Sequence, residues 1–148
     1  NRYIYERTEG EKYATLFYAA IRRDGLMHWT NAGLCPPIRL SRSGVMESLP
    51  PTAMPVGMLD VSEFGVQTDQ FAAGDKLTIF SDGLTEAQNA EGEYFETERI
   101  RGILQQSGQL AAQAVHAAVL SAVEAFAGDH PQNDDMTLVV AEYNPAAW

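Results

Sequence analysis

Lys76-Leu-Thr-Ile-Phe-Ser-Asp-Gly83 is the stretch of sequence that decides the fold. Its first part, Lys76–Phe80, is compact and apolar and predicts a buried strand. This strand leads directly into a Ser-Asp-Gly turn. A carboxylate at that point is held rigidly by the sheet and is exposed at its edge. Asp82 is therefore the first candidate for a functional side chain.

The segments on either side of this strand predict the rest of the architecture. Tyr13–Ile21 is aromatic and β-branched and predicts a mostly buried strand, and Asp24-Gly25 predicts the hairpin turn after it. Glu98–Gln106 predicts a helix, and Met136–Val140 predicts a closing strand. Strands, then two helices, then a strand indicate an α+β fold with helices on one face of a largely antiparallel sheet.

The second predicted helix carries an apolar stripe. Its apolar residues recur at spacings of three and four, which is the period of an amphipathic helix. They are Leu110, Ala114, Val115, Ala118, Val119, Ala122, Val123 and Phe126. The stripe needs a sheet or another helix to cover it, whereas His116 lies off the stripe and is expected to face solvent.

Composition and charge limit the possible functions. The 148 residues are 45% hydrophobic and 20% charged, which is typical of one globular domain. The net charge of −10 repels phosphates and anionic lipids, so neither nucleic acid nor a membrane is an expected partner. No apolar run is long enough for a membrane span. The single cysteine, Cys35, excludes an internal disulfide and favours a reducing compartment, so a cytoplasmic location is expected.

A second acidic site, Asp134-Asp135, comes directly before the predicted closing strand. If the closing strand neighbours Lys76–Phe80, these carboxylates and Asp82 converge. Converging carboxylates repel one another, and a hard divalent cation with oxygen ligands relieves the repulsion. The residues alone leave open the simpler alternative that Asp82 and Asp134 only begin turns.

A third acidic group precedes the first predicted helix. Carboxylates at a helix start interact favourably with the helix dipole, so a solvated face is the expected role. The group consists of Glu91, Glu93, Glu96 and Glu98.

The chain resembles the PPM family of metal-dependent Ser/Thr phosphatases, in its bacterial sporulation stage II E-like and RsbU-like branch. Several separated motifs carry the resemblance, in the order and at the spacing of that branch. They are Thr15–Tyr18, Asn31–Gly33 with Pro36-Pro37, Pro55–Leu59, Asp75–Ala87, Asn89–Phe95 and Asn133–Leu138. The similarity extends over nearly the whole chain.

This resemblance implies a sandwich of two antiparallel sheets flanked by helices, with a two-metal Mn²⁺ or Mg²⁺ centre. Asp82 and Asp134 match metal-ligating positions, and Asp135 holds the adjoining position. The implied reaction is direct hydrolysis of phosphoserine or phosphothreonine by metal-bound water. The implied substrate is a STAS-domain anti-sigma antagonist, and a sensor or receiver domain is expected upstream. The resemblance leaves a homodimer open.

The family's first metal motif, Gly-Asp before a Gly-rich turn, has no counterpart in residues 1–148. The chain therefore resembles the C-terminal two thirds of a single phosphatase domain, truncated on its N-terminal side. On its own it is expected to be inactive, with an incomplete metal centre. Two alternatives remain: a non-catalytic phosphatase-like interaction module, and a single-site Ca²⁺ or Mg²⁺ binder.

Overall fold

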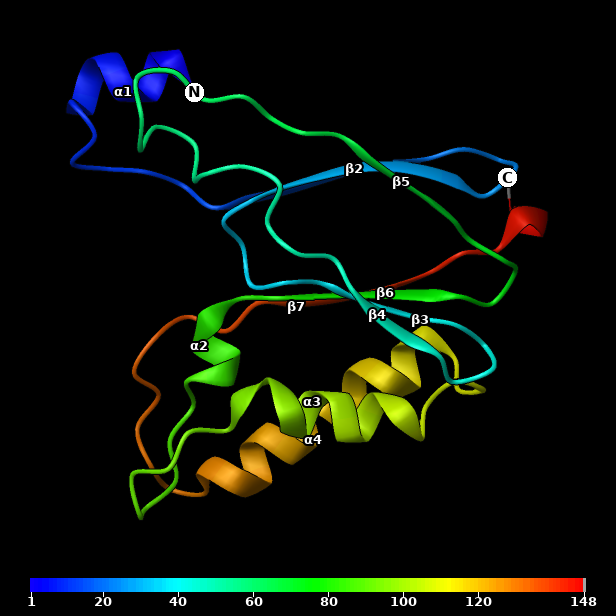
Figure 1. Cartoon of the computed structure of the whole chain (residues 1–148). Coiled ribbons are helices and arrows are strands. Elements are labelled where there is room, and N and C mark those ends of the chain that lie inside the picture. Colours follow the sequence, from blue (N-terminus) through cyan, green and yellow to red (C-terminus); the bar gives the residue numbers. More distant parts are fainter. Residues whose placement is uncertain (148) are drawn as a thin grey trace. The chain divides into compact units, whose positions relative to one another are not determined.

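The computed structural model describes residues 1–147. The chain forms two compact units, each with its own antiparallel sheet (Figure 1). The first unit contains Asn1–Pro36, Leu49–Phe71 and the residues from Pro145, and the second contains Pro37–Ser48 and Ala72–Asn144. Antiparallel sheets combined with helices confirm the predicted α+β class. Over residues 1–147, no helix is both long enough and apolar enough to cross a membrane.

The first unit has a three-stranded sheet in the order β1-β2-β5. Its elements are α1 (Arg2–Thr8), β1 (Leu16–Ile21), β2 (Leu26–Ala32), β5 (Gln67–Gln70) and the short 3₁₀ helix Pro145–Ala147. The predicted hairpin joins β1 to β2. Gly25 in this hairpin has φ +84°, and a Cβ there would lie 2.2 Å from the carbonyl oxygen of Phe71. Only glycine therefore fits this turn.

The prediction that the first strand is mostly buried is wrong. β1 lies at the edge of its sheet, and within residues 1–147 it pairs with β2 alone. Its residues alternate between half-buried and exposed, and the side chains of Leu16 and Tyr18 are 45% and 62% exposed. Its half-buried face is apolar, and Phe17 stacks there on Trp29 with ring centroids 5.9 Å apart. An aromatic composition indicates a strand but does not say how many of its faces are covered.

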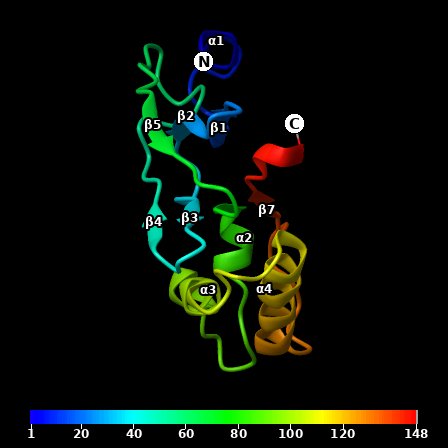
Figure 2. The same ribbon diagram turned by 90° about the vertical axis from the view of Figure 1, so that its right-hand side faces the viewer.

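The second unit is built on a four-stranded antiparallel sheet in the order β4-β3-β6-β7. Its strands are β3 (Ile38–Leu40), β4 (Met46–Ser48), β6 (Lys76–Phe80) and β7 (Leu138–Glu142). Its helices are α2 (Asp82–Thr85), α3 (Glu96–Gln105) and α4 (Ala112–Ala127), and α3 and α4 lie on the same side of the sheet (Figures 1 and 2). β6 has the bounds predicted from the sequence, and it pairs with β3 on one side and β7 on the other.

The apolar stripe of α4 begins later than predicted. Val115, Val119 and Val123 are its buried residues, and the helix packs against β7 and α3. Leu110 is 44% exposed because it precedes the helix, and Ala114 in the first turn is exposed. His116 is half-buried rather than turned fully to solvent.

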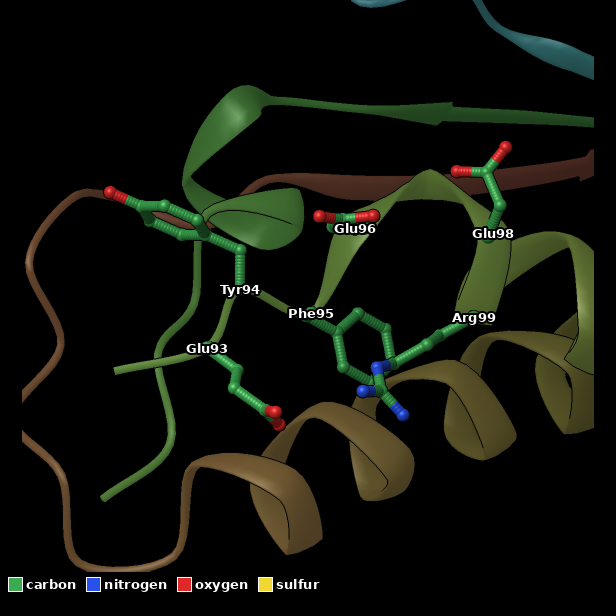
Figure 3. A pocket seen from close by; sticks show the side chains of 6 residues that line it. All are labelled: Glu93, Tyr94, Phe95, Glu96, Glu98 and Arg99. Atoms are coloured by element: carbon green, nitrogen blue, oxygen red, sulfur yellow. The ribbon is translucent and has the colours of Figure 1, made fainter. Parts of the chain in front are cut away.

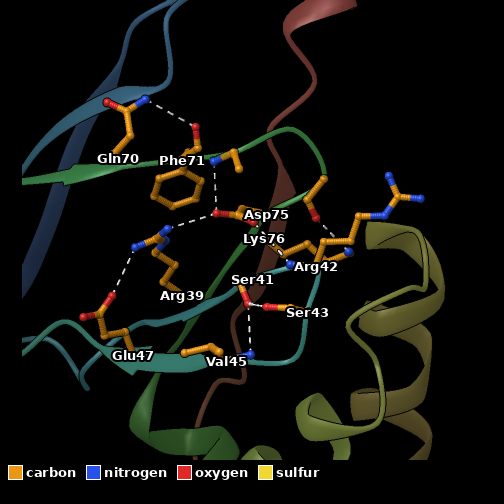
Figure 4. Close-up of polar contacts among 12 residues, drawn as sticks. Arg39, Ser41, Arg42, Ser43, Val45, Glu47, Gln70, Phe71, Asp75 and Lys76 are labelled. Atoms are coloured by element: carbon orange, nitrogen blue, oxygen red, sulfur yellow. Dashed lines mark hydrogen bonds and ion pairs between the residues drawn. The ribbon is translucent and has the colours of Figure 1, made fainter.

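A buried carboxylate anchors the start of β6 (Figure 4). Asp75 is 2% exposed and accepts a hydrogen bond of 3.0 Å from the Arg39 guanidinium on β3. It also accepts the backbone N–H groups of Arg42 and Ala72, at 3.2 and 3.1 Å. Because a buried charge needs such partners, Asp75 ties β3 and the turn before β6 into one arrangement. At the other end of β6, Phe80 leads through Ser81 to Asp82.

Candidate metal centre

The end of β6 turns into the single-turn helix α2. Ser81 occupies the N-cap position, and Asp82 is the first helical residue. One Asp82 carboxylate oxygen accepts the N–H of Gly83 at 3.0 Å. The sequence predicts only a glycine turn here, since the glycine in this helix disfavours helical structure. The difference leaves Asp82 where the pattern of an apolar strand followed by a turn predicts it, exposed at the rim of the sheet.

The second acidic segment is the loop between α4 and β7. One carboxylate oxygen of Asp134 accepts the N–H of Asp135 at 2.7 Å. The side-chain amide of Gln132 donates to the Asp134 carbonyl at 2.7 Å, and the side-chain amide of Asn133 donates to Gln88 at 3.2 Å. Asp134 and Asp135 are both exposed. The loop is therefore held by its own polar side chains while both carboxylates face solvent.

The two acidic segments touch one another. β6 and β7 are neighbours with Phe80 opposite Leu138, and Ser81 and Thr137 extend the contact by hydrogen bonds. A Cβ added to Gly83 would lie 2.4 Å from the carbonyl oxygen of Asp135. The predicted convergence of the two strand ends is therefore confirmed at the level of the backbone. The role of Asp82, Asp134 and Asp135 as metal ligands stays a prediction.

The chemistry of these side chains suits a hard cation. All three are carboxylates, the ligand type that Mg²⁺ and Mn²⁺ prefer. In Asp82 and Asp134 one oxygen accepts a neighbouring N–H, which leaves the other oxygen for a ligand. Within residues 1–147, however, no group of three or more His, Cys, Asp or Glu side chains is arranged to hold a metal ion. The described residues fit one part of a metal centre.

Ser81 is the residue at this site that sequence analysis missed. Its hydroxyl contacts the backbone of both Asp135 and Thr137. Its position between a buried strand and an Asp-Gly pair was the available signal, but serine there more often caps a helix.

The third acidic group begins in the turn before α3 and continues into the first turn of that helix, and it is exposed as predicted. Glu91, Glu93, Glu96 and Glu98 are exposed, and the last two occupy the first turn of α3. Figure 3 shows a shallow pocket near these residues. It is lined by Glu93, Glu96 and Glu98 together with Tyr94, Phe95 and Arg99. The Arg99 guanidinium stacks over the Phe126 ring, 4.5 Å from its centroid. Glu96 and Glu98 therefore form a solvated helix start, and Glu91 and Glu93 lie in the turn before it.

The close approach at Gly83 gives a stability prediction. We expect Gly83→Ala to lower the free energy of unfolding by about 1–3 kcal/mol, because the new methyl group would collide with backbone that cannot rotate away. Gly102→Ala is the matched control, since Gly102 lies within α3, and among the described residues outside its own helix turn none has an atom within 4 Å of an added Cβ. Removing a helical glycine there should raise stability by about 0.5–1 kcal/mol. Urea unfolding of both variants measures the difference. Equal effects would mean that the two acidic segments are not in contact.

The chain matches a known protein family over nearly its whole length. The model of the family described as stage II sporulation protein E (SpoIIE) matches residues 1–144. Protein IcfG of Synechocystis sp. is 32% identical over 89 residues, which are 60% of this chain and 14% of that protein.

Solved structures share the fold at low sequence identity. The RsbU and RsbW domains of a Mycobacterium tuberculosis protein superpose with a TM-score of 0.74 at 21% identity, over 97% of this chain and 40% of that one. The SiaA-PP2C domain of Pseudomonas aeruginosa gives 0.71 at 20% identity, over 83% and 48%. The manganese-soaked SpoIIE phosphatase domain of Bacillus subtilis gives 0.66 at 19% identity, over 88% and 56%.

The chain thus spans about half or less of each of these relatives. The family match extends over nearly all of this chain and agrees with the motifs that carry the resemblance. The chain belongs to the stage II sporulation protein E (SpoIIE) family.

Proposed function

We propose that this chain is part of a metal-dependent protein phosphatase that removes phosphoryl groups from serine or threonine in bacterial signalling. One observation carries the proposal: the Asp82 and Asp134-Asp135 segments touch at the ends of two neighbouring strands. Family membership supports it. A STAS-domain anti-sigma antagonist is the proposed substrate, and a sensor or receiver domain the proposed upstream regulator.

The three carboxylates share one role in this mechanism. Asp82, Asp134 and Asp135 would hold Mn²⁺ or Mg²⁺ through carboxylate oxygens. When bound, the metal would lower the pKa of a coordinated water and offset the negative charge of phosphate oxygens. β6 and β7 orient the carboxylates, since each carboxylate lies at most a few residues from a paired strand. Exposure of all three leaves room for a phosphorylated side chain of a protein.

A two-metal centre needs more ligands than these three residues supply. We expect the remainder, including the Gly-Asp motif of the family, in the parent protein outside residues 1–148. The lack of a group of three ligands in residues 1–147 also favours a second candidate function, a phosphatase-like module that binds a partner without hydrolysis.

Phosphate release separates the two candidates. We expect the parent protein to hydrolyse phosphoserine and phosphothreonine peptides with Mn²⁺ or Mg²⁺. This phosphate release should stop when EDTA removes the metal. Residues 1–148 alone should release no phosphate under the same conditions, because in-line attack needs both ions. A parent protein that is inactive with either metal would favour the binding module. Robust activity of residues 1–148 would mean that the catalytic site lies elsewhere.

A further inference from the structure

The hydroxyl of Ser81 makes hydrogen bonds that are unusual for a serine at the start of a helix. Serine at an N-cap commonly accepts a backbone N–H from the first turn of its own helix. Ser81 occupies the N-cap of α2 but makes no such bond. The carboxylate of Asp82 accepts the N–H of Gly83 instead. The Ser81 hydroxyl is therefore available for a different segment.

That segment is the loop carrying Asp134 and Asp135. The Ser81 hydroxyl donates to the Asp135 carbonyl at 3.1 Å and accepts the N–H of Thr137 at 2.9 Å. The backbone N–H of Ser81 donates to the Thr137 carbonyl at 3.0 Å. One side chain thus spans the loop from the residue before Met136 to the residue after it.

The reason lies in the change from strand to helix. In an antiparallel ladder the Ser81 carbonyl would accept the N–H of Thr137. Here that carbonyl accepts the N–H of Leu84 instead, at 3.2 Å, in the first turn of α2. The hydroxyl takes the place of the carbonyl in the ladder. The chain can therefore turn into α2 directly after β6 without releasing the neighbouring segment (Figure 1).

We propose that Ser81 is a positioning residue of the metal centre, which fixes the distance between Asp82 and the Asp134-Asp135 pair and so sets metal affinity. This proposal rests on the proposed function. Groups that orient metal ligands without touching the metal commonly change affinity about 10- to 100-fold when they are removed. Ser81 fits that role because it is bonded to Asp82 in sequence and to Asp135 in space.

The test compares three variants of the full-length protein. Ser81→Ala removes the hydroxyl, and Ser81→Thr retains it. Thr85→Ala is the matched control, since the Thr85 hydroxyl donates within the same turn to the Asp82 carbonyl at 3.0 Å and has no hydrogen bond to residues 134–137. Electron paramagnetic resonance of free Mn²⁺ measures affinity without relying on activity. Hydrogen exchange of the Thr137 amide measures the local contact.

We expect Ser81→Ala to weaken Mn²⁺ binding about tenfold or more and to speed exchange at Thr137. Ser81→Thr should restore most of the affinity, and Thr85→Ala should stay within about twofold of the unsubstituted protein. Equal Mn²⁺ affinity in Ser81→Ala, or an equal loss in Thr85→Ala, would overturn the role of Ser81 alone. No Mn²⁺ binding by the unsubstituted protein would overturn the metal centre itself and the role of Ser81 with it.

Discussion

Replacing Asp82 by Asn in the parent protein is expected to abolish most phosphatase turnover while the fold stays intact. The amide keeps the shape of the side chain but removes the negative charge that would hold the cation. Loss of a group that only orients a metal ligand already costs about 10- to 100-fold. Loss of a ligand itself should therefore lower kcat by more than about 100-fold. Phosphate release from a phosphoserine peptide under saturating Mn²⁺ measures the effect.

Asp129→Asn is the matched control for this experiment. Asp129 is an exposed carboxylate just after α4 and lies outside the contact between the two acidic segments. The same change of charge there should leave kcat within about twofold, since long-range surface charge is screened by salt. Thermal unfolding of both variants checks that the fold is retained. Full activity of Asp82→Asn would contradict the assignment of Asp82 to the metal.

The largest expected loss of stability comes from Val119→Asp. Val119 is fully buried on the face of α4 that packs against the sheet. A carboxylate there would lose its water without gaining a partner. We expect the free energy of unfolding to fall by about 3–5 kcal/mol, a large part of the stability of a small domain. Urea unfolding followed by circular dichroism measures the change.

Ser121→Asp introduces the same residue on the exposed side of α4. Serine and aspartate have similar helix propensities, so this control should change stability by less than about 0.5 kcal/mol. The difference in the free energy of unfolding between the two variants separates the effect of burying the carboxylate from the effect of helix propensity. Similar losses in both would mean that the buried face of α4 has been assigned to the wrong residues.

The sequence was most informative where composition and turn chemistry agree. β6 has its predicted bounds because an apolar run ends at a turn signal on both sides. The nearness of Asp82 to Asp134-Asp135 could also be predicted, because both come at ends of apolar strands. Residue types alone did not decide whether these carboxylates bind metal or begin turns.

Tertiary contacts explain the features that were not predicted. β1 lies at a sheet edge, and no local pattern in Tyr13–Ile21 specifies how many neighbours a strand has. α2 is a single turn that begins Asp-Gly, a pair with poor helix propensity. The contact of Ser81 with the 134–137 loop joins residues far apart in the chain. The pattern of residue types within either segment does not predict such a contact.

The pairing of β6 with β7 has a consequence for how the nascent chain matures. As the protein emerges from the ribosome, β3, β4 and β6 are available early, whereas β7 comes after α3 and α4. β6 therefore waits with one edge open until Leu138–Glu142 has been made. Asp82 cannot meet Asp134 and Asp135 before that moment. In the proposed metal centre, metal capture would thus be a late event of biosynthesis, and the ion would not serve as a template for the early steps of folding.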